Sequence, residues 1–237
     1  MDKRFLGVLG AVVVVMAAIF IFTNHSSGNK GTSSSNSSQP SSHIEGKGAD
    51  GVTLLEYGDY ECPYCSEYSP IVNQVVALYN NDIYFQFRNL PLTEVHPNAF
   101  AGARAAEAAG LQNKYWQMHD LLYANQNQWV PTSDPETDFI QYAQQLGLNI
   151  TKFKSDYTSA QVNNVITADL NAFTATGAQE ATPTFFLDGT QVSPQLSVSS
   201  FEQVINAEIK KKTGKASGIG STATTSNSST SAPKSTN

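Results

Sequence analysis

The sequence predicts an α/β fold for residues 48–213 of the 237-residue chain. Three observations predict it. The first part of this region alternates strand and helix patterns, the middle is typical of consecutive helices, and the last part returns to strands before a closing helix. Aromatic residues make up 10% of the chain and charged residues 14%, which allows an ordinary hydrophobic core without a highly charged surface.

The first part contains a strand, a helix and a second strand. Residues 51–57, GVTLLEY, are a short β-rich run. In residues 62–81 the apolar and aromatic side chains recur at helical spacing; Pro63 suits the first helical position, whereas Pro70 should kink or interrupt the helix. Residues 82–92 alternate apolar and polar side chains, as a half-buried strand does.

Helical patterns then continue through residues 97–178, which predict four or five segments and begin with an alanine-rich run. Asn149 is placed to cap one of these helices, and glycines at 110, 147 and 177 lie where helices would end. After this block, residues 181–192 (ATPTFFLDGTQV) predict two strands joined at an Asp-Gly turn. Residues 197–213 predict the closing helix, with three lysines in its last turn.

The N-terminus carries a long apolar segment. Residues 5–22 follow Lys3 and Arg4 and span about 27 Å as a helix, enough to cross a bilayer. We expect an uncleaved transmembrane anchor, with a cleaved signal sequence as the alternative, since no clear A-x-A site follows. The positive charges should keep residues 1–4 in the cytoplasm. The chain is then membrane-anchored with its domain outside the cytoplasm, at the cell surface or in the periplasm, where disulfides persist.

Low-complexity segments flank the predicted domain. Residues 23–47 predict a disordered Ser-rich linker, and residues 214–237 a disordered Ser/Thr-rich tail. The domain between them holds 18 acidic and 8 basic residues, and the whole chain has a formal net charge of −6. Because an acidic domain does not suit phosphate backbones, nucleic-acid binding is not expected.

Cys62 and Cys65 are the only cysteines, and they lie at the predicted strand-to-helix turn. A zinc site needs four ligands, but there is no second C-x-x-C, and His25 and His43 fall in the predicted linker. A structural disulfide would close only a tiny loop and add little stability. A redox pair fits better, because a helix N-terminus stabilises a thiolate and the second thiol lies on the same helix face. A metal ligand and an inert pair remain the alternatives.

The motifs together resemble a known family. VTLLEYGDYECPYC, YFQFRNLPL, the alanine-rich region that begins HPNA, and TPTFFLDG are similar to DsbA-like thiol-disulfide oxidoreductases of the DsbA/BdbD type. The resemblance covers residues 48–213 and implies a thioredoxin-like fold with an inserted helical subdomain at about 97–178. CPYC alone is less specific, because glutaredoxins carry it too.

The resemblance implies roles for five residues. Cys62 matches the exposed attacking cysteine and Cys65 the buried resolving cysteine. Pro183 matches a cis-proline loop that faces the disulfide, and the backbone of Thr182 before it can pair with an extended substrate; a simple strand entry is the alternative. Glu56 matches a buried acid that relays the proton of Cys65; a surface glutamate is the alternative.

Three further side chains near the motif bear on its chemistry. Asp59 and Glu61 depart from the apolar flank of the best-known oxidases and could oppose thiolate formation. His96 precedes a proline, and we expect a loop residue there in preference to a ligand or base.

The expected function is that of a membrane-anchored extracytoplasmic oxidoreductase that introduces disulfides into reduced secreted or surface proteins through Cys62 and Cys65. It needs no cofactor beyond this redox-active disulfide, and no metal. A DsbB- or VKOR-like membrane protein could reoxidise it. We expect a monomer, because residues 23–50 offer no core for a dimerisation domain. The alternatives are a disulfide reductase or isomerase, a non-catalytic peptide-binding module and a metal-handling module.

Overall fold

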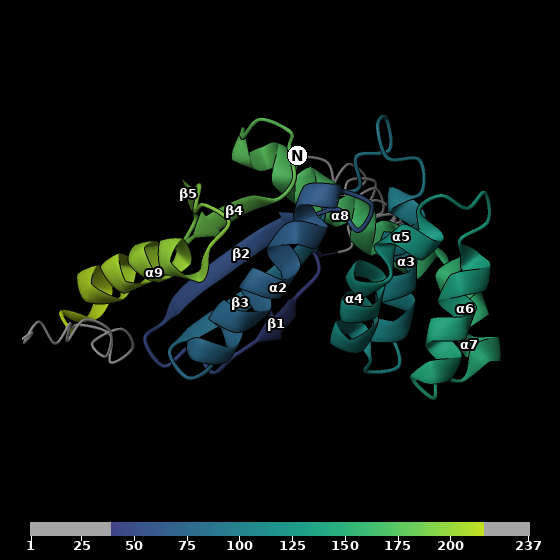
Figure 1. The fold of residues 1–237 in the computed structure, drawn as a ribbon, viewed down its shortest axis with the longest axis horizontal. Coiled ribbons are helices and arrows are strands. Elements are labelled where there is room, and N and C mark those ends of the chain that lie inside the picture. Colours follow the sequence, from purple (N-terminus) through teal and green to yellow (C-terminus); the bar gives the residue numbers. More distant parts are fainter. Residues whose placement is uncertain (1–38, 216–237) are drawn as a thin grey trace, which may run out of the picture. The chain divides into compact units, whose positions relative to one another are not determined.

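A computed structural model describes residues 39–215 of the chain (Figure 1). The expected anchor at 5–22 and most of the expected linker and tail lie outside the described residues. Within the described residues, no helix combines the length and the apolar character that a membrane crossing requires.

A five-stranded mixed sheet forms the centre of the domain, in the order β1-β3-β2-β4-β5. The pair β2–β3 is parallel, and the other three pairs are antiparallel. This arrangement confirms the predicted α/β class and the thioredoxin-like fold. The strands are β1 (His43–Glu45), β2 (Val52–Gly58), β3 (Ile83–Asn89), β4 (Thr184–Leu187) and β5 (Thr190–Val192).

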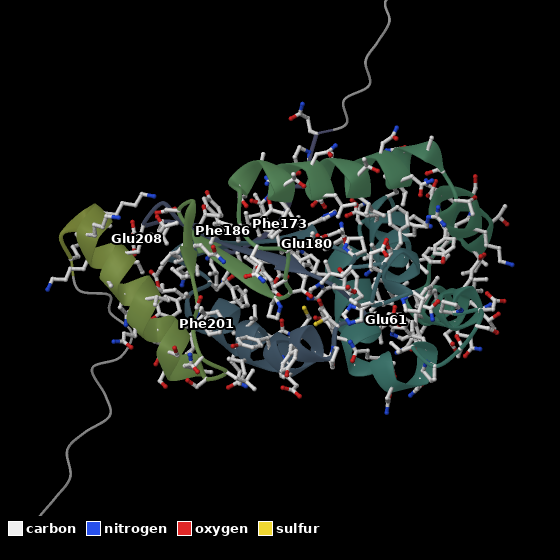
Figure 2. The ribbon with its side chains drawn as sticks, turned by 90° about the horizontal axis from the view of Figure 1, so that it is seen from above. Glu61, Phe173, Glu180, Phe186, Phe201 and Glu208 are labelled. Atoms are coloured by element: carbon white, nitrogen blue, oxygen red, sulfur yellow. The ribbon has the colours of Figure 1, made fainter. Side chains whose placement is uncertain are left out.

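Helices cover both faces of this sheet. Helix α2 (Pro63–Leu78) and helix α9 (Val198–Thr213) pack on one face, where Val52 and Leu54 of β2 join the main core. Helix α8 (Ala160–Thr176) crosses the other face, where Phe173 and Phe186 both pack against Tyr57 (Figure 2). The alternation of β2 side chains between these two cores is what a strand buried on both faces requires.

The predicted helical insertion is present between β3 and β4. Besides α8 it contains α3 (Ala99–Gly110), α4 (Tyr115–Ala124), α5 (Gln126–Trp129), α6 (Glu136–Gln145) and α7 (Ile150–Tyr157). The alanines of α3 allow close helix packing, and most of them are fully buried. Asn149 caps α7 as predicted, since its side chain accepts the N–H of Lys152.

Two local predictions have different outcomes. Asp188 and Gly189 join β4 to β5 with φ values of 47° and 80°, as the Asp-Gly turn predicts. Helix α2 continues through Pro70, so the expectation that this proline interrupts the helix was wrong, whereas a kink there stays a prediction. Pro70 is exposed, while Val72, Val75 and Val76 of the same helix are buried; packing of this face holds the helix through the proline.

The prediction that the disordered linker extends to residue 47 was wrong. Strand β1 pairs with β3 from His43 opposite Phe87 to Glu45 opposite Phe85, and Ser41 before it is buried. The folded domain therefore begins before Gly48. The strand has only three residues and a single apolar one, so it has no hydrophobic pattern to detect.

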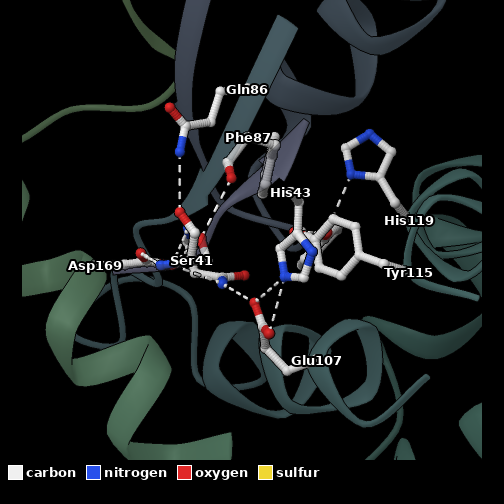
Figure 3. Close-up of polar contacts among 10 residues, drawn as sticks. Ser41, His43, Gln86, Phe87, Glu107, Tyr115, His119 and Asp169 are labelled. Carbon is white, nitrogen blue, oxygen red and sulfur yellow. Dashed lines mark hydrogen bonds and ion pairs between the residues drawn. The ribbon is translucent and has the colours of Figure 1, made fainter. Parts of the chain in front are cut away.

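Polar contacts hold this strand in place (Figure 3). The carboxylate of Asp169 on α8 accepts the N–H of Ser41 at 2.7 Å and its hydroxyl at 2.8 Å, and it also accepts the backbone N–H of Asn89 at 3.0 Å. The Asn89 amide also donates to Glu107 on α3 at 2.7 Å, and Glu107 pairs with His43 at 2.9 Å. One buried network thus joins β1, β3, α3 and α8.

Replacement of Asp169 should destabilise the fold strongly. Asp169→Ala leaves the buried N–H groups of Ser41 and Asn89 without their acceptor, at about 1–3 kcal/mol for each. We expect a loss of about 2–5 kcal/mol in the free energy of unfolding in urea. The control Glu208→Gln, which removes an exposed pair with Lys211, should change it by less than about 1 kcal/mol. A loss below about 1 kcal/mol for Asp169→Ala would contradict the structural role of the network.

Candidate active site

The two cysteines lie where β2 gives way to α2. Cys62 is the N-cap of α2, Pro63 occupies the first helical position, and Cys65 follows in the first turn. Both cysteines are thiols in this structure. Cys65 is fully buried, as expected, but the expectation of an exposed Cys62 was wrong, because only 4% of this residue is accessible. The loop before β4 covers it: the Cys62 thiol donates to the carbonyl of Thr182 at 3.4 Å.

The surroundings of Cys62 favour its thiolate. A hydrogen bond from the Cys65 thiol, the side chain of Thr182 and the backbone N–H groups of Tyr64 and Cys65 lower its pKa to about 6, against the opposing effect of burial. The N–H groups are those left free at the start of a helix. The Thr182 hydroxyl is buried and has no other hydrogen-bond partner among the described residues.

The pKa of Cys65 shifts in the opposite direction. Burial raises its pKa well above the usual value, and the negative charges of Cys62 and Glu56 raise it further. The backbone N–H of Asp59, at 3.5 Å from the Cys65 sulfur, acts against this shift. These shifts favour a thiolate at Cys62 and a protonated thiol at Cys65 near neutral pH. That Cys62 is the nucleophile of the pair stays a prediction.

Glu56 lies on β2 and is 2% exposed. Burial, with a contribution from the charge of Cys62, raises its pKa to about 8. The structure thus bears out the expectation of a buried acid over that of a surface glutamate. A carboxyl group with this pKa exchanges its proton readily near neutral pH. That Glu56 relays the proton of Cys65 stays a prediction.

The Thr182–Pro183 peptide bond is cis, and the loop faces the cysteines as expected. Pro183 lines a groove of about 230 Å³ beside the thiols. Tyr64, the most exposed aromatic residue of the site at 64%, forms part of the same wall. The other lining residues are Tyr68, Thr182, Thr184, Phe185, Gln191, Val192, Ser193, Pro194 and Gln195.

Asp59 and Glu61 are both buried and engaged in hydrogen bonds, and neither is among the main influences on the Cys62 pKa. Glu61 accepts the N–H of Asn98 at 2.5 Å. Asp59 pairs with His96, whose Nδ1 lies 2.8 Å from the carboxylate. The sequence therefore missed a partner of the active-site turn at His96, and its position before a proline gave no signal of this contact.

A second missed residue is Gln126, at the start of α5. Its side-chain amide donates to the carbonyls of Tyr60 and Cys62, at 2.9 Å each. The helical insertion thus contacts the backbone of the motif directly. No local sequence pattern predicts this role, because only the tertiary contact with Tyr60 and Cys62 distinguishes Gln126 from the other glutamines nearby.

The comparisons with known proteins agree with this geometry. A family model described as Thioredoxin matches residues 38–207, which is most of the chain. The chain belongs to the thioredoxin family.

Several solved structures share this fold. BdbD from Bacillus subtilis aligns over 73% of this thioredoxin-family chain and 96% of its own, at 21% identity and a TM-score of 0.63. A thioredoxin-like oxidoreductase from Silicibacter pomeroyi aligns over 71% and 92%, at 24% identity and a TM-score of 0.59. MdbA from Corynebacterium diphtheriae, a thiol-disulfide oxidoreductase, aligns over 70% and 95%, at 20% identity and a TM-score of 0.53. The fold is therefore that of DsbA/BdbD-type proteins, as the resemblance implied.

The curated relatives carry another name. The Na(+)/H(+) antiporter NhaA 1 of Salinispora arenicola is 39% identical over 147 residues, which are 62% of this thioredoxin-family chain but only 22% of the antiporter. NhaA 3 of Salinispora tropica is 37% identical over the same length. The chain spans about a fifth of the length of these relatives.

Glu56 should lower the stability of the protein as the pH rises. Because its folded pKa is about 8 against an ordinary value of 4.5, the folded protein holds this proton more tightly than the unfolded chain. The resulting stability is fully present below pH 4.5 and is lost as the pH rises through 8. Glu56→Gln should therefore match the wild type near pH 4.5 and exceed its free energy of unfolding by about 4 kcal/mol at pH 8.5.

Urea unfolding at pH 4.5, 6, 7 and 8.5 measures this difference. Glu94→Gln, at an exposed position, serves as the control and should differ from the wild type by less than about 0.5 kcal/mol throughout. A Glu56→Gln difference that stays constant with pH would show that the Glu56 carboxyl is not perturbed.

Proposed function

We propose that this chain is a thiol-disulfide oxidoreductase that introduces disulfides into proteins outside the cytoplasm. The observation that carries the proposal is the unequal pair of thiols at the start of α2: the pKa of Cys62 is lowered to about 6, and that of Cys65 is raised well above its usual value. Such a pair attacks and releases through one sulfur and opens or closes the disulfide with the other.

The exchange proceeds in two displacements. A client thiolate attacks the Cys62 sulfur of the Cys62–Cys65 disulfide; the bond between the two cysteines breaks, and Cys65 leaves as a thiolate and takes up a proton, for which Glu56 is the nearby acid. A second client thiolate then attacks the client sulfur of the mixed disulfide, and Cys62 leaves as a thiolate. Two electrons pass from the client to the protein, and the client gains one disulfide.

The low pKa of Cys62 favours oxidation of clients over their reduction. A thiolate stabilised in the folded dithiol form is a good leaving group, and it makes the reduced protein the more favourable product. The acidic neighbours do not reverse this preference, because Asp59 and Glu61 are engaged with backbone N–H groups. For this reason we propose that the protein oxidises its clients, in preference to reducing or isomerising their disulfides.

The groove beside Pro183 suits an extended client segment. Its walls combine tyrosine rings with backbone and hydroxyl groups, which bind peptides with little demand on their sequence. We propose that reduced secreted or surface proteins present their cysteines there. The apolar run 5–22 and the positive charges before it support a membrane anchor, with the domain outside the cytoplasm. A DsbB- or VKOR-like membrane protein would then restore the disulfide of the monomeric enzyme.

The reduced form should be more stable than the disulfide form at pH 8. The folded pKa of Cys62 is about 6 against an ordinary value of 9.0, so this contribution is present above pH 9 and is lost as the pH falls through 6. At pH 8 it amounts to about 3 kcal/mol. The disulfide closes so short a loop that it constrains the unfolded chain by only about 2 kcal/mol. The balance therefore favours the reduced form at pH 8 and shifts toward the oxidised form at pH 6.

Urea unfolding of both redox forms at pH 6, 7 and 8 tests this balance. The advantage of the reduced form should grow by about 2 kcal/mol from pH 6 to pH 8. Oxidised protein should also form disulfides in a reduced, unfolded client faster than reduced protein cleaves those of insulin. A more stable disulfide form at pH 8, together with faster insulin reduction, would make the protein a reductase.

A further inference from the structure

Asp59 is held from two sides in the turn that precedes Cys62. Its side chain is fully buried. One carboxylate oxygen accepts the N–H of Glu61 at 2.8 Å, which closes the turn itself. The other accepts the N–H of Leu92 at 2.9 Å and lies 2.8 Å from Nδ1 of His96, both in the loop after β3. His96 is thus the only side-chain partner of this carboxylate among the contacts within residues 39–215.

The backbone of the same residue meets both cysteines. The N–H of Asp59 donates to the Cys65 sulfur at 3.5 Å, and its carbonyl accepts the N–H of Cys62 at 3.1 Å. The Tyr123 hydroxyl also donates to this carbonyl, at 3.4 Å. The Asp59 N–H belongs to the peptide that follows Gly58, whose carbonyl accepts the N–H of Leu90 at 2.8 Å. The contacts of the Asp59 carboxylate add a second restraint on the direction in which this N–H points.

That direction matters when Cys65 carries charge. Burial and two negative neighbours disfavour its thiolate, and the Asp59 N–H is the group that opposes them. A hydrogen bond from an N–H to sulfur strengthens as negative charge develops on the sulfur. It therefore stabilises the transition state in which the Cys65 sulfur enters or leaves a disulfide more than it stabilises the resting thiol.

We propose that His96 is a positioning residue for the Cys65 step: it holds the Asp59 carboxylate so that the Asp59 N–H points at the Cys65 sulfur. This inference rests on the proposed function of the same site. In the closing direction, the Cys65 thiolate attacks the Cys62 sulfur of a mixed disulfide, the bond between Cys62 and the partner sulfur breaks, and the partner leaves as a thiolate. In the opening direction, Cys65 is the leaving thiolate of the same transition state.

A symmetrical aromatic disulfide, dithiobis(nitrobenzoate), separates this step from the first. The reduced protein reacts in two phases, each of which releases one coloured nitrobenzoate thiolate. In the first, Cys62 attacks the reagent at a rate proportional to its concentration. In the second, Cys65 displaces the remaining nitrobenzoate from Cys62 at a rate independent of the reagent. Stopped-flow absorbance records both in one experiment.

The variant His96→Leu should slow the second phase by about three- to tenfold, the effect of one lost hydrogen bond. It should change the first by less than about twofold. His96→Asn places an amide nitrogen near the position of Nδ1 and should restore the second phase to within about twofold of the wild type. This rescue separates positioning through a hydrogen bond from a simple need for bulk.

His43 offers a matched control, because it forms the same kind of pair. Its Nε2 lies 2.9 Å from Glu107, and its side chain is 21% exposed against 19% for His96. His43→Leu should leave both phases within about twofold of the wild type. An equal slowing in His43→Leu and His96→Leu, a His96→Leu second phase at the wild-type rate, or a failure of His96→Asn to rescue would each overturn the proposal for His96.

The failure of the proposed function has a different signature. If the wild-type protein releases only one equivalent of nitrobenzoate, Cys65 does not resolve the mixed disulfide, and the proposed exchange falls together with the role of His96. If the wild type releases two equivalents and only the His96 variants behave unexpectedly, the exchange function stands and the positioning role alone is wrong.

Discussion

The effect of the Cys65 thiol on the Cys62 sulfur is the interaction on which the site depends. It is the largest influence that lowers the pKa of Cys62, and the same contact raises the pKa of Cys65. These opposite shifts favour a thiolate at Cys62 and a protonated thiol at Cys65 near neutral pH. The helix N-terminus, the Thr182 loop and the buried Glu56 also influence which of the two sulfurs carries a negative charge.

The fold supplies the geometry for that distribution. The parallel pair β2–β3 brings the turn after β2 next to the loop after β3, so Asp59 and His96 meet although they are far apart in the sequence. The antiparallel pair β2–β4 brings the Thr182 loop against the start of α2. The helical insertion adds Gln126, which holds the carbonyl of Cys62. The neighbours of the thiols therefore come from β2 and the turn after it, from the loop before β4 and from the insertion.

Sequence patterns predicted the elements that have a hydrophobic period and the residues that lie in a local motif. Strand β2, the insertion helices and the β4–β5 turn have such patterns, and Cys62 is marked by its place before Pro63 at a helix start. Glu56 and Thr182 came from the resemblance to a family, because nothing local distinguishes a buried glutamate from an exposed one in a strand.

The remaining features depend on contacts between distant residues. Strand β1 has one apolar residue, and its place in the domain follows from Ser41 and His43 and their carboxylate partners. His96 lies in a loop whose sequence resembles any X-Pro turn, and its partner is 37 residues away. The accessibility of Cys62 was misjudged for the same reason, since the covering loop is 120 residues later in the chain.

The most direct test of this account is the pH dependence of alkylation at each cysteine. Native, reduced protein is given a short pulse of iodoacetamide between pH 4 and 10, and the modified peptides are quantified by mass spectrometry. The account predicts that Cys62 is modified first, with a midpoint near pH 6, and that Cys65 stays protected throughout this range. Equal modification of the two cysteines, or a Cys62 midpoint near the ordinary thiol value of about 8.5, would contradict it.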